Sequence, residues 1–316
     1  MGEPDDEITF EFVPLIRCYK SGRVERLLPD TRVPPSLDPA TGVASRDVTI
    51  DQSTGLWARL YLPPSSAAGE LLPVVVYLHG GGLVVGSAAD ALEHGFLNRL
   101  SSRARVLVVS VDYRLAPEHL VPACYDDACA ALRWATSSSS TDTWLRDHGD
   151  IRRVFVLGYS SGANIAHNVT LHGGERVKGM ALLHPCFISS KKADGEVKNA
   201  WLRKKLEELW ALACGGEMTA SAVAAALDDP RIDPVVDGAP SLRRLGCDRV
   251  LVCLADEELE VRGRVYYDAL LESGWAEDAV ELFVAGGDHE YFQREPDGDM
   301  AVALMDRLVA FFGGNE

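Results

Sequence analysis

Residues 154–167 read Val-Phe-Val-Leu-Gly-Tyr-Ser-Ser-Gly-Ala-Asn-Ile-Ala-His, and this stretch decides the fold. The apolar residues 154–157 predict a short buried strand, and residues 163–167 begin a helical pattern. Between them, Gly158-Tyr-Ser160-Ser-Gly162 fits the G-x-S-x-G turn that carries a nucleophilic serine from a strand to a helix. Glycine is needed at both ends because a side chain there would collide with the neighbouring strand or helix. The pattern therefore predicts Ser160 as a nucleophile raised above the edge of a sheet.

The length and composition fit one large domain with a sizeable core. The chain has 316 residues, enough for an α/β domain with a cap, and 47% of them are hydrophobic. The formal net charge is −16 at pH 7. An acidic surface argues against nucleic acid and against an anionic membrane as partners, and we interpret the charge as a source of solubility.

The N-terminus and the cysteines predict a cytoplasmic protein. The chain opens with MGEPDDEITFEF, which is acidic and lacks the basic and apolar regions of a secretory signal. It has no uninterrupted run of 18 apolar residues, so the sequence predicts no membrane span. Seven cysteines with no C-x-x-C pair indicate reduced core thiols rather than a disulfide framework or a zinc site.

Apolar runs of strand length recur along the chain and alternate with helical stretches. Such runs predict strands buried on both faces, and the alternation predicts a mostly parallel sheet with helices on both sides. Residues 46–62 alternate between apolar and polar instead, which predicts an antiparallel hairpin at the start of the sheet. The predicted buried strands occupy residues 73–78, 106–111, 154–157, 177–183, 249–255 and 280–284.

Two segments depart from this alternation and predict a cap. In residues 1–45, apolar residues that include Phe10 and Phe12 could form one face of a helix. In residues 189–228, apolar residues that include Trp201 and Trp210 recur at helical spacing. This insertion is either a core-facing helix or a helical cap. We favour the cap because the insertion follows the C-terminal end of a strand, where the sites of α/β proteins lie.

A serine hydroxyl needs a base to act as a nucleophile, and the base needs an orienting acid. His289 follows the predicted strand 280–284 through a glycine-containing loop, and the chain order serine, acid, histidine is the α/β-hydrolase order. We therefore predict His289 as the base. The acid is expected after the strand 249–255, where Asp256, Glu257 and Glu258 compete. A surface acidic turn would account for any two of the three.

The oxyanion that forms during acyl transfer needs backbone N–H donors. Ser161, the residue after the nucleophile, supplies one. The glycines of His79-Gly-Gly-Gly82 supply the others, as in an HGGG-type loop. The chain has neither G-x-x-x-x-G-K-[ST] nor a G-x-G-x-x-G that opens a helix, so the sequence predicts no nucleotide site.

These motifs resemble the α/β-hydrolase fold and, within it, the hormone-sensitive-lipase-like group. The resemblance narrows to the plant carboxylesterases and covers nearly the whole chain. The matching motifs are His79-Gly-Gly-Gly82, Asp112-Tyr-Arg-Leu-Ala-Pro-Glu-His119, Gly158-Tyr-Ser-Ser-Gly162, Tyr19-Lys-Ser-Gly-Arg-Val-Glu-Arg26, Pro34-Pro-Ser-Leu-Asp-Pro39, Tyr125-Asp-Asp-Ala128, Asp229-Pro-Arg-Ile-Asp-Pro234 and Ser273-Gly-Trp275.

The resemblance implies a serine carboxylesterase that hydrolyses short-chain acyl esters of small molecules without a cofactor or metal. It implies one α/β-hydrolase domain over residues 1–316, with cap elements at about 1–45 and 189–228. In relatives of this kind the second and third glycines of the loop donate to the oxyanion, which here are Gly81 and Gly82.

Two stretches depart from the family pattern. In the elbow, Tyr159, Ser161 and Ala163 replace Asp, Ala and Gly of the usual Gly-Asp-Ser-Ala-Gly-Gly, and Tyr159 removes a charge beside the nucleophile. The acid loop is one residue shorter than in the family. Counting forward from Ala255 gives Glu258 as the acid, and counting back from Gly263 gives Glu257. We expect Glu258.

Three alternatives to a working esterase are open. Gibberellin receptors of the same family bind a hormone and have lost the catalytic histidine, whereas His289 is present here. An isoflavanone dehydratase uses similar residues to eliminate water. The altered elbow and acid loop are also compatible with a weak or inactive esterase. The catalytic order of Ser160, acid and His289 favours hydrolysis.

Overall fold

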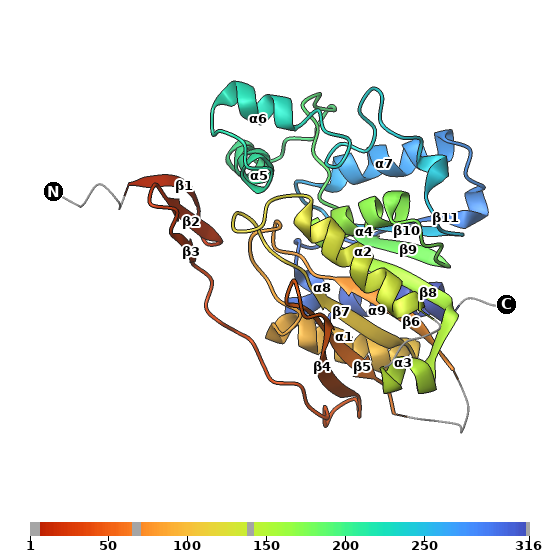
Figure 1. Cartoon of the computed structure of the whole chain (residues 1–316). Helices are drawn as coiled ribbons and strands as arrows, with labels where there is room; N and C mark the ends of the chain where they lie inside the picture. Colours follow the sequence, from red (N-terminus) through yellow and green to blue (C-terminus); the bar gives the residue numbers. More distant parts are fainter. Residues whose placement is uncertain (1–6, 65–70, 138–141, 314–316) are drawn as a thin grey trace.

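An eight-stranded sheet forms the centre of the molecule, in the order β11-β10-β9-β8-β6-β7-β5-β4 (Figure 1). The computed structural model describes residues 7–64, 71–137 and 142–313, so the first six residues, on which part of the location prediction rests, lie outside it. Neighbouring strands from β11 to β7 run parallel, whereas β5 is antiparallel to both β7 and β4. The predicted mostly parallel sheet and its initial hairpin are confirmed. The strands are β4 (Ala44–Asp51), β5 (Leu56–Leu62), β6 (Leu72–Leu78), β7 (Leu107–Asp112), β8 (Gly149–Tyr159), β9 (Gly179–Leu183), β10 (Val250–Leu254) and β11 (Val280–Val284).

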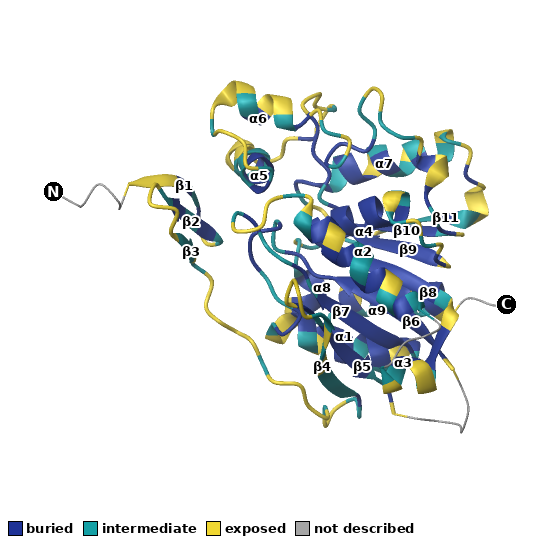
Figure 2. Ribbon diagram, in the orientation of Figure 1, coloured by how far each residue is buried: buried dark blue, intermediate teal, exposed yellow. Residues whose placement is uncertain are grey.

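Helices cover both faces of the sheet, because alternate side chains of each strand point to opposite sides. In β6, Val75 and Tyr77 pack into the same cluster as α1 and α9, whereas Val74 and Val76 pack with α4. Figure 2 shows the central strands buried and the outer faces of the helices exposed. One face carries α1 (Ala91–Ala104), α8 (Tyr291–Arg294) and α9 (Asp299–Gly313), and the other carries α2 (Ala123–Thr136), α3 (Thr143–His148), α4 (Ser161–His172) and α7 (Glu260–Glu272).

The N-terminal arm forms a small antiparallel sheet of β1 (Ile8–Phe12), β2 (Ile16–Tyr19) and β3 (Val24–Arg26). The expectation of a helix in this arm is wrong. Phe10 and Phe12 alternate with polar residues, so a strand buries both of them on one side, as the structure does. The insertion forms α5 (Ala200–Ala213) and α6 (Ala220–Ala226). The arm lies on the side of the molecule that carries α5 (Figure 1). The rings of Phe12 and Trp201 meet there edge to face, with centroids 5.6 Å apart.

The C-terminal ends of the parallel strands meet at one edge of the sheet. The register pairs Leu78 of β6 with Gly158 of β8, and Gly158 with Leu182 of β9. Leu254 of β10 pairs with Val284 of β11. The glycine loop, the elbow, the acidic turn and the histidine loop all begin at this edge, which is where α/β folds place their sites.

Candidate active site

Ser160 stands at the tip of the turn between β8 and α4. Its φ and ψ are 56° and −119°, a conformation that is strained for a residue with a side chain. The Ser160 N–H donates to the Leu183 carbonyl at 2.8 Å, which ties the turn to β9. A Cβ on Gly158 would lie 2.2 Å from the Gly162 oxygen, and one on Gly162 would lie 2.0 Å from the Leu78 oxygen. Only glycine fits at both positions, so the elbow predicted from the sequence is built as its motif requires.

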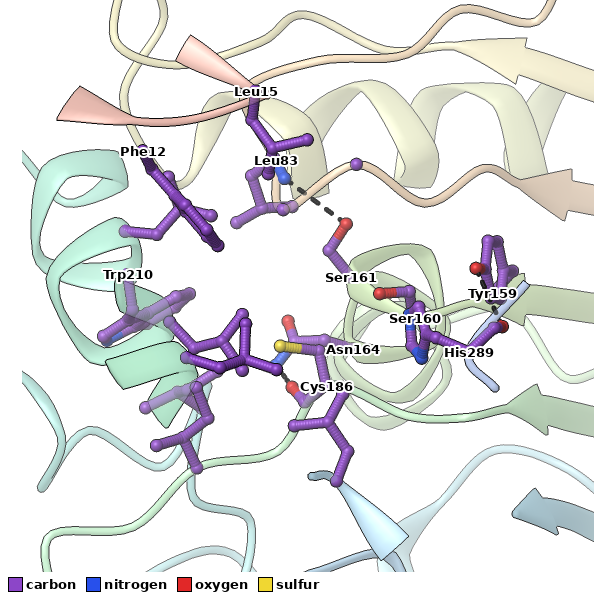
Figure 3. A pocket seen from close by; sticks show the side chains of 18 of the residues that line it. Phe12, Leu15, Leu83, Tyr159, Ser160, Ser161, Asn164, Cys186, Trp210 and His289 are labelled. Atoms are coloured by element: carbon purple, nitrogen blue, oxygen red, sulfur yellow. Dashed lines mark hydrogen bonds between the residues drawn. The ribbon is translucent and has the colours of Figure 1, made fainter. Parts of the chain in front are cut away.

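His289 reaches the site from the loop between β11 and α8, and Glu257 reaches it from the turn after β10. The Nδ1 atom of His289 lies 3.0 Å from Oε1 of Glu257, and the side chains are 29% and 14% exposed. The pair is close but poorly aligned for a hydrogen bond, and neither atom has another hydrogen-bond partner among the described residues. Such loose geometry is common before a substrate binds. Ser160 and His289 both line the same pocket (Figure 3).

The structure places Glu257, and not the expected Glu258, against His289. The Glu258 carboxylate accepts hydrogen bonds from the N–H groups of Lys198 and Asn199, at 3.0 and 2.7 Å, where α5 begins. Asp256 is 74% exposed and pairs with the Lys198 ammonium at 2.6 Å. Of the three competing carboxylates, Glu257 is the one held against His289. The shortened loop therefore follows the count made backward from Gly263.

Electrostatics favour the protonated form of His289. Burial by itself would lower the pKa of this imidazole, but the Glu257 carboxylate, with Glu290 and Asp288 nearby, outweighs burial and raises the pKa above its usual 6.5. An imidazolium formed by proton transfer from a serine would be stabilised in the same way.

The glycine loop lies across the pocket from His289. Gly81, Gly82 and Ser161 all line the pocket. Their three backbone N–H groups donate to no partner within the described chain, so they are available to a bound oxygen atom. The Leu83 N–H donates to Ser161 Oγ at 3.3 Å, which holds the loop to the elbow (Figure 3).

The pocket has a volume of about 260 Å³, and most of its wall is apolar. Phe12 and Leu15 come from the N-terminal arm, and Trp210 comes from α5. The indole N–H of Trp210 donates to the Ala226 carbonyl at 2.8 Å, so α6 fixes this ring. Trp201 lies outside the pocket wall and is 56% exposed. The other apolar side chains of the wall are Leu83, Cys186, Ile188, Leu202, Leu206, Leu209, Ile232 and Leu259.

The sequence motifs do not point to the wall residues of the arm or to the side chains around His289. Phe12 falls in the segment expected to present a helix face, although the alternation in Ile8–Phe12 signals a strand. His184, directly after β9, donates from Nδ1 to the His289 carbonyl at 2.9 Å. Its position after a buried strand was the available signal. Across the described residues, no group of three or more His, Cys, Asp or Glu side chains is arranged to hold a metal ion.

The sheet and its elbow are those of an α/β-hydrolase fold, and the comparisons with known proteins agree on the fold. A family model described as alpha/beta hydrolase fold matches residues 75–293. The esterase LipW from Mycobacterium marinum superposes with a TM-score of 0.68 at 26% identity, covering 86% of this chain and 82% of that one. The esterase from Pyrobaculum calidifontis gives 0.67 at 28% identity, covering 85% and 84%.

Plant proteins similar to this chain identify a group within the α/β-hydrolase family. Tuliposide A-converting enzyme 1 of Tulipa gesneriana is 39% identical over 98% of this chain and 79% of its own length. The 2-hydroxyisoflavanone dehydratase of Glycyrrhiza echinata is 40% identical, and probable carboxylesterase 2 of Arabidopsis thaliana is 34% identical, each over 96% of both chains. The chain belongs to the α/β-hydrolase family, within the plant carboxylesterase group related to hormone-sensitive lipase. Membership of this group supports a hydrolase that acts on small molecules.

The comparisons overturn the predicted cytoplasmic location. Three tulip relatives that match over 98% of this chain are named chloroplastic or amyloplastic. The acidic N-terminus therefore carries no weight as an indicator of the cytoplasm. Within the described parts of the chain, no helix is both long enough and apolar enough to cross a membrane.

Proposed function

We propose that the protein is a serine carboxylesterase that works through an acyl-enzyme. The observation that carries the proposal is that Ser160, His289 and Glu257 line one apolar pocket together with three backbone N–H groups that have no hydrogen-bond partner among the described residues. His289 takes the proton of the Ser160 hydroxyl as its oxygen attacks the ester carbonyl. Glu257 holds the imidazole and stabilises the imidazolium that results.

The oxyanion of the tetrahedral intermediate is bound by the N–H groups of Gly81, Gly82 and Ser161. Losing one such donor typically costs about 3–4 kcal/mol of transition-state stabilisation. The C–O bond of the ester then breaks, and His289 returns its proton to the leaving alcohol. A water molecule, deprotonated by the same histidine, releases the acid from Ser160.

The wall of the pocket favours a neutral, apolar ester of a small molecule. Glu257 and Glu290 are the charged residues among those that line the described pocket, and both are acidic. An anionic acyl group would meet these carboxylates in a partly desolvated space, which is unfavourable. No Lys or Arg is among the residues that line the described pocket, and His289 must be neutral to act as the base. The small β1–β3 sheet and α5 act as the cap that closes this space over the substrate.

A dehydratase is the second candidate, because the Glycyrrhiza relative of that name is 40% identical over 96% of the chain. The same base and N–H groups would serve an elimination that removes a proton and stabilises a carbonyl oxygen. A hormone receptor is less favoured, because a binding protein has no need of a histidine held by Glu257. The names of the tulip relatives favour a plastid as the location.

Rapid mixing with p-nitrophenyl butyrate tests the proposal. We expect a burst of nitrophenolate equal to the enzyme concentration if acylation outpaces deacylation, and in every case steady turnover that Ser160→Ala abolishes. Turnover that survives in correctly folded Ser160→Ala protein would contradict the proposal. Absence of ester turnover together with conversion of a 2-hydroxyisoflavanone would establish the dehydratase instead.

A further inference from the structure

Two buried side chains bind the backbone of the proposed base. The Tyr159 hydroxyl donates to the His289 carbonyl at 3.0 Å (Figure 3), and Nδ1 of His184 faces the same oxygen at 2.9 Å. Both side chains are almost completely buried, with 4% and 1% of the residue exposed. A carbonyl oxygen has two lone pairs, so these two donors satisfy it completely.

The protonation states support this arrangement. Burial, helped by the neighbouring His289, lowers the pKa of His184 to about 4, so its ring is neutral at neutral pH. A neutral imidazole carries one proton, and the facing carbonyl assigns that proton to Nδ1. Burial also raises the pKa of the Tyr159 hydroxyl well above 10, which keeps it as a donor.

Tyr159 also makes contacts that fix where its hydroxyl lies. Its ring centroid is 5.1 Å from the His289 ring and 5.0 Å from the Phe292 ring. A Cβ placed on Gly80 would come within 2.8 Å of Tyr159 Cδ1, so the ring also lies directly against the glycine loop. One side chain thus touches the base loop and the loop of the oxyanion donors.

We propose that Tyr159 is a positioning residue that, with His184, holds the His289 backbone so that the imidazole stays between Glu257 and Ser160. This inference rests on the proposed esterase function. The resembling family has Asp at this position. An ionised carboxylate only accepts hydrogen bonds and has no proton to give a carbonyl. An ionised Asp at this position therefore could not make the hydrogen bond that Tyr159 donates to the His289 carbonyl.

The experiment compares Tyr159→Phe with the matched control Tyr291→Phe. Each variant removes one hydroxyl from the group of packed rings formed by Tyr159, His184, His289, Tyr291 and Phe292. The Tyr291 hydroxyl has no hydrogen-bond partner among the described residues, whereas the Tyr159 hydroxyl binds His289. Two readouts are taken: kcat and KM with p-nitrophenyl butyrate, and the pKa of the His289 imidazole by NMR of histidine-labelled protein. Assignment uses a His289→Gln sample.

For Tyr159→Phe we expect kcat to fall about 5- to 10-fold with KM within twofold, as for loss of one neutral hydrogen bond. The His289 pKa falls as well, because a displaced ring pairs less closely with Glu257. Tyr291→Phe matches the wild type in both readouts. The proposal is overturned if either readout of Tyr159→Phe equals the wild type, or if Tyr291→Phe changes as much. A wild type without ester turnover refutes the esterase separately, and the NMR comparison then decides the positioning role alone.

Discussion

Replacing Glu257 by Gln tests the proposed acid most directly, because Glu258 offers a control of the same chemistry one residue away. Both substitutions remove one negative charge and keep the side-chain length. In the structure the first takes the charge from His289, at 3.0 Å, and the second takes it from the start of α5. The two variants therefore distinguish the two possible assignments of the acid in the shortened loop, Glu257 and Glu258.

The expected magnitude follows from what each carboxylate binds. A triad acid changed to its amide holds the imidazole in the wrong tautomer and no longer stabilises the imidazolium, an effect of about 10⁴ in the serine-protease template. Glu257 and His289 are 14% and 29% exposed, so water compensates in part. We expect Glu257→Gln to lower kcat about 10³-fold, or about 4 kcal/mol.

Glu258→Gln is expected to lower kcat no more than about threefold. The amide oxygen at 258 can still accept from the Lys198 and Asn199 N–H groups, and what is lost is about 0.3–1 kcal/mol of charge–dipole stabilisation at the helix start. Steady-state hydrolysis of p-nitrophenyl butyrate measures both variants, and urea unfolding checks that each is folded. A larger loss in Glu258→Gln than in Glu257→Gln would refute the assignment.

Three further predictions concern pH, substrate binding and stability. Because the base must be neutral and Glu257 raises the pKa of His289, the acid limb of kcat/KM should have its midpoint above pH 6.5, and a midpoint at or below that value contradicts the pairing. Phe12→Ala should raise KM for apolar esters about 5- to 30-fold with little change in kcat, because about 1–2 kcal/mol of apolar contact is lost. The control Ile8→Ala changes a residue of the same strand that is 48% exposed, and it should leave KM unchanged. Equal effects of the two substitutions would exclude the arm from the pocket. Glu196→Gln should destabilise folding by about 3–5 kcal/mol in urea, because it removes the carboxylate that pairs with the buried guanidinium group of Arg262 and leaves the buried Arg203 with Glu207 alone. Burial by itself would raise the pKa of Glu196, but its pairing with the two arginines lowers the pKa below 4.5. The stabilisation from Glu196 is therefore present above pH 4.5 and is lost as the pH falls through the lowered pKa. A free energy of unfolding that does not change with pH in this range would contradict the pairing.

The sheet was predictable because its strands are buried on both faces. A continuous apolar run such as residues 73–78 has few alternatives to a central strand, and the structure places β6 at Leu72–Leu78. The arm was not predictable in the same way. Its five-residue strand Ile8–Phe12 has only two buried aromatic residues, so period 2 and period 3.6 were hard to separate.

The candidate site was predictable only in part. The placement of Ser160 and His289 in one pocket was predictable because each follows a strand end that the sequence marks clearly. The carboxylate that faces His289 was not predictable, since three adjacent carboxylates follow β10 and a tight turn decides where each points. The Glu257 N–H donates to the Ala255 carbonyl at 2.9 Å within that turn. No pattern of residue types specifies that geometry, and one residue of register moves a side chain from the base to the cap.

This turn also joins the base to the cap, which gives the neighbouring carboxylates a role of their own. Glu257 faces His289, and the next residue binds the N–H groups at the start of α5, whose Trp210 closes the pocket. Lys198, just before α5, pairs on the outside with Asp256 and Glu260, at 2.6 and 2.9 Å. Two consecutive residues of this turn therefore contact the two sides of the pocket, because Glu257 lies against His289 and Glu258 binds the N–H groups at the start of α5.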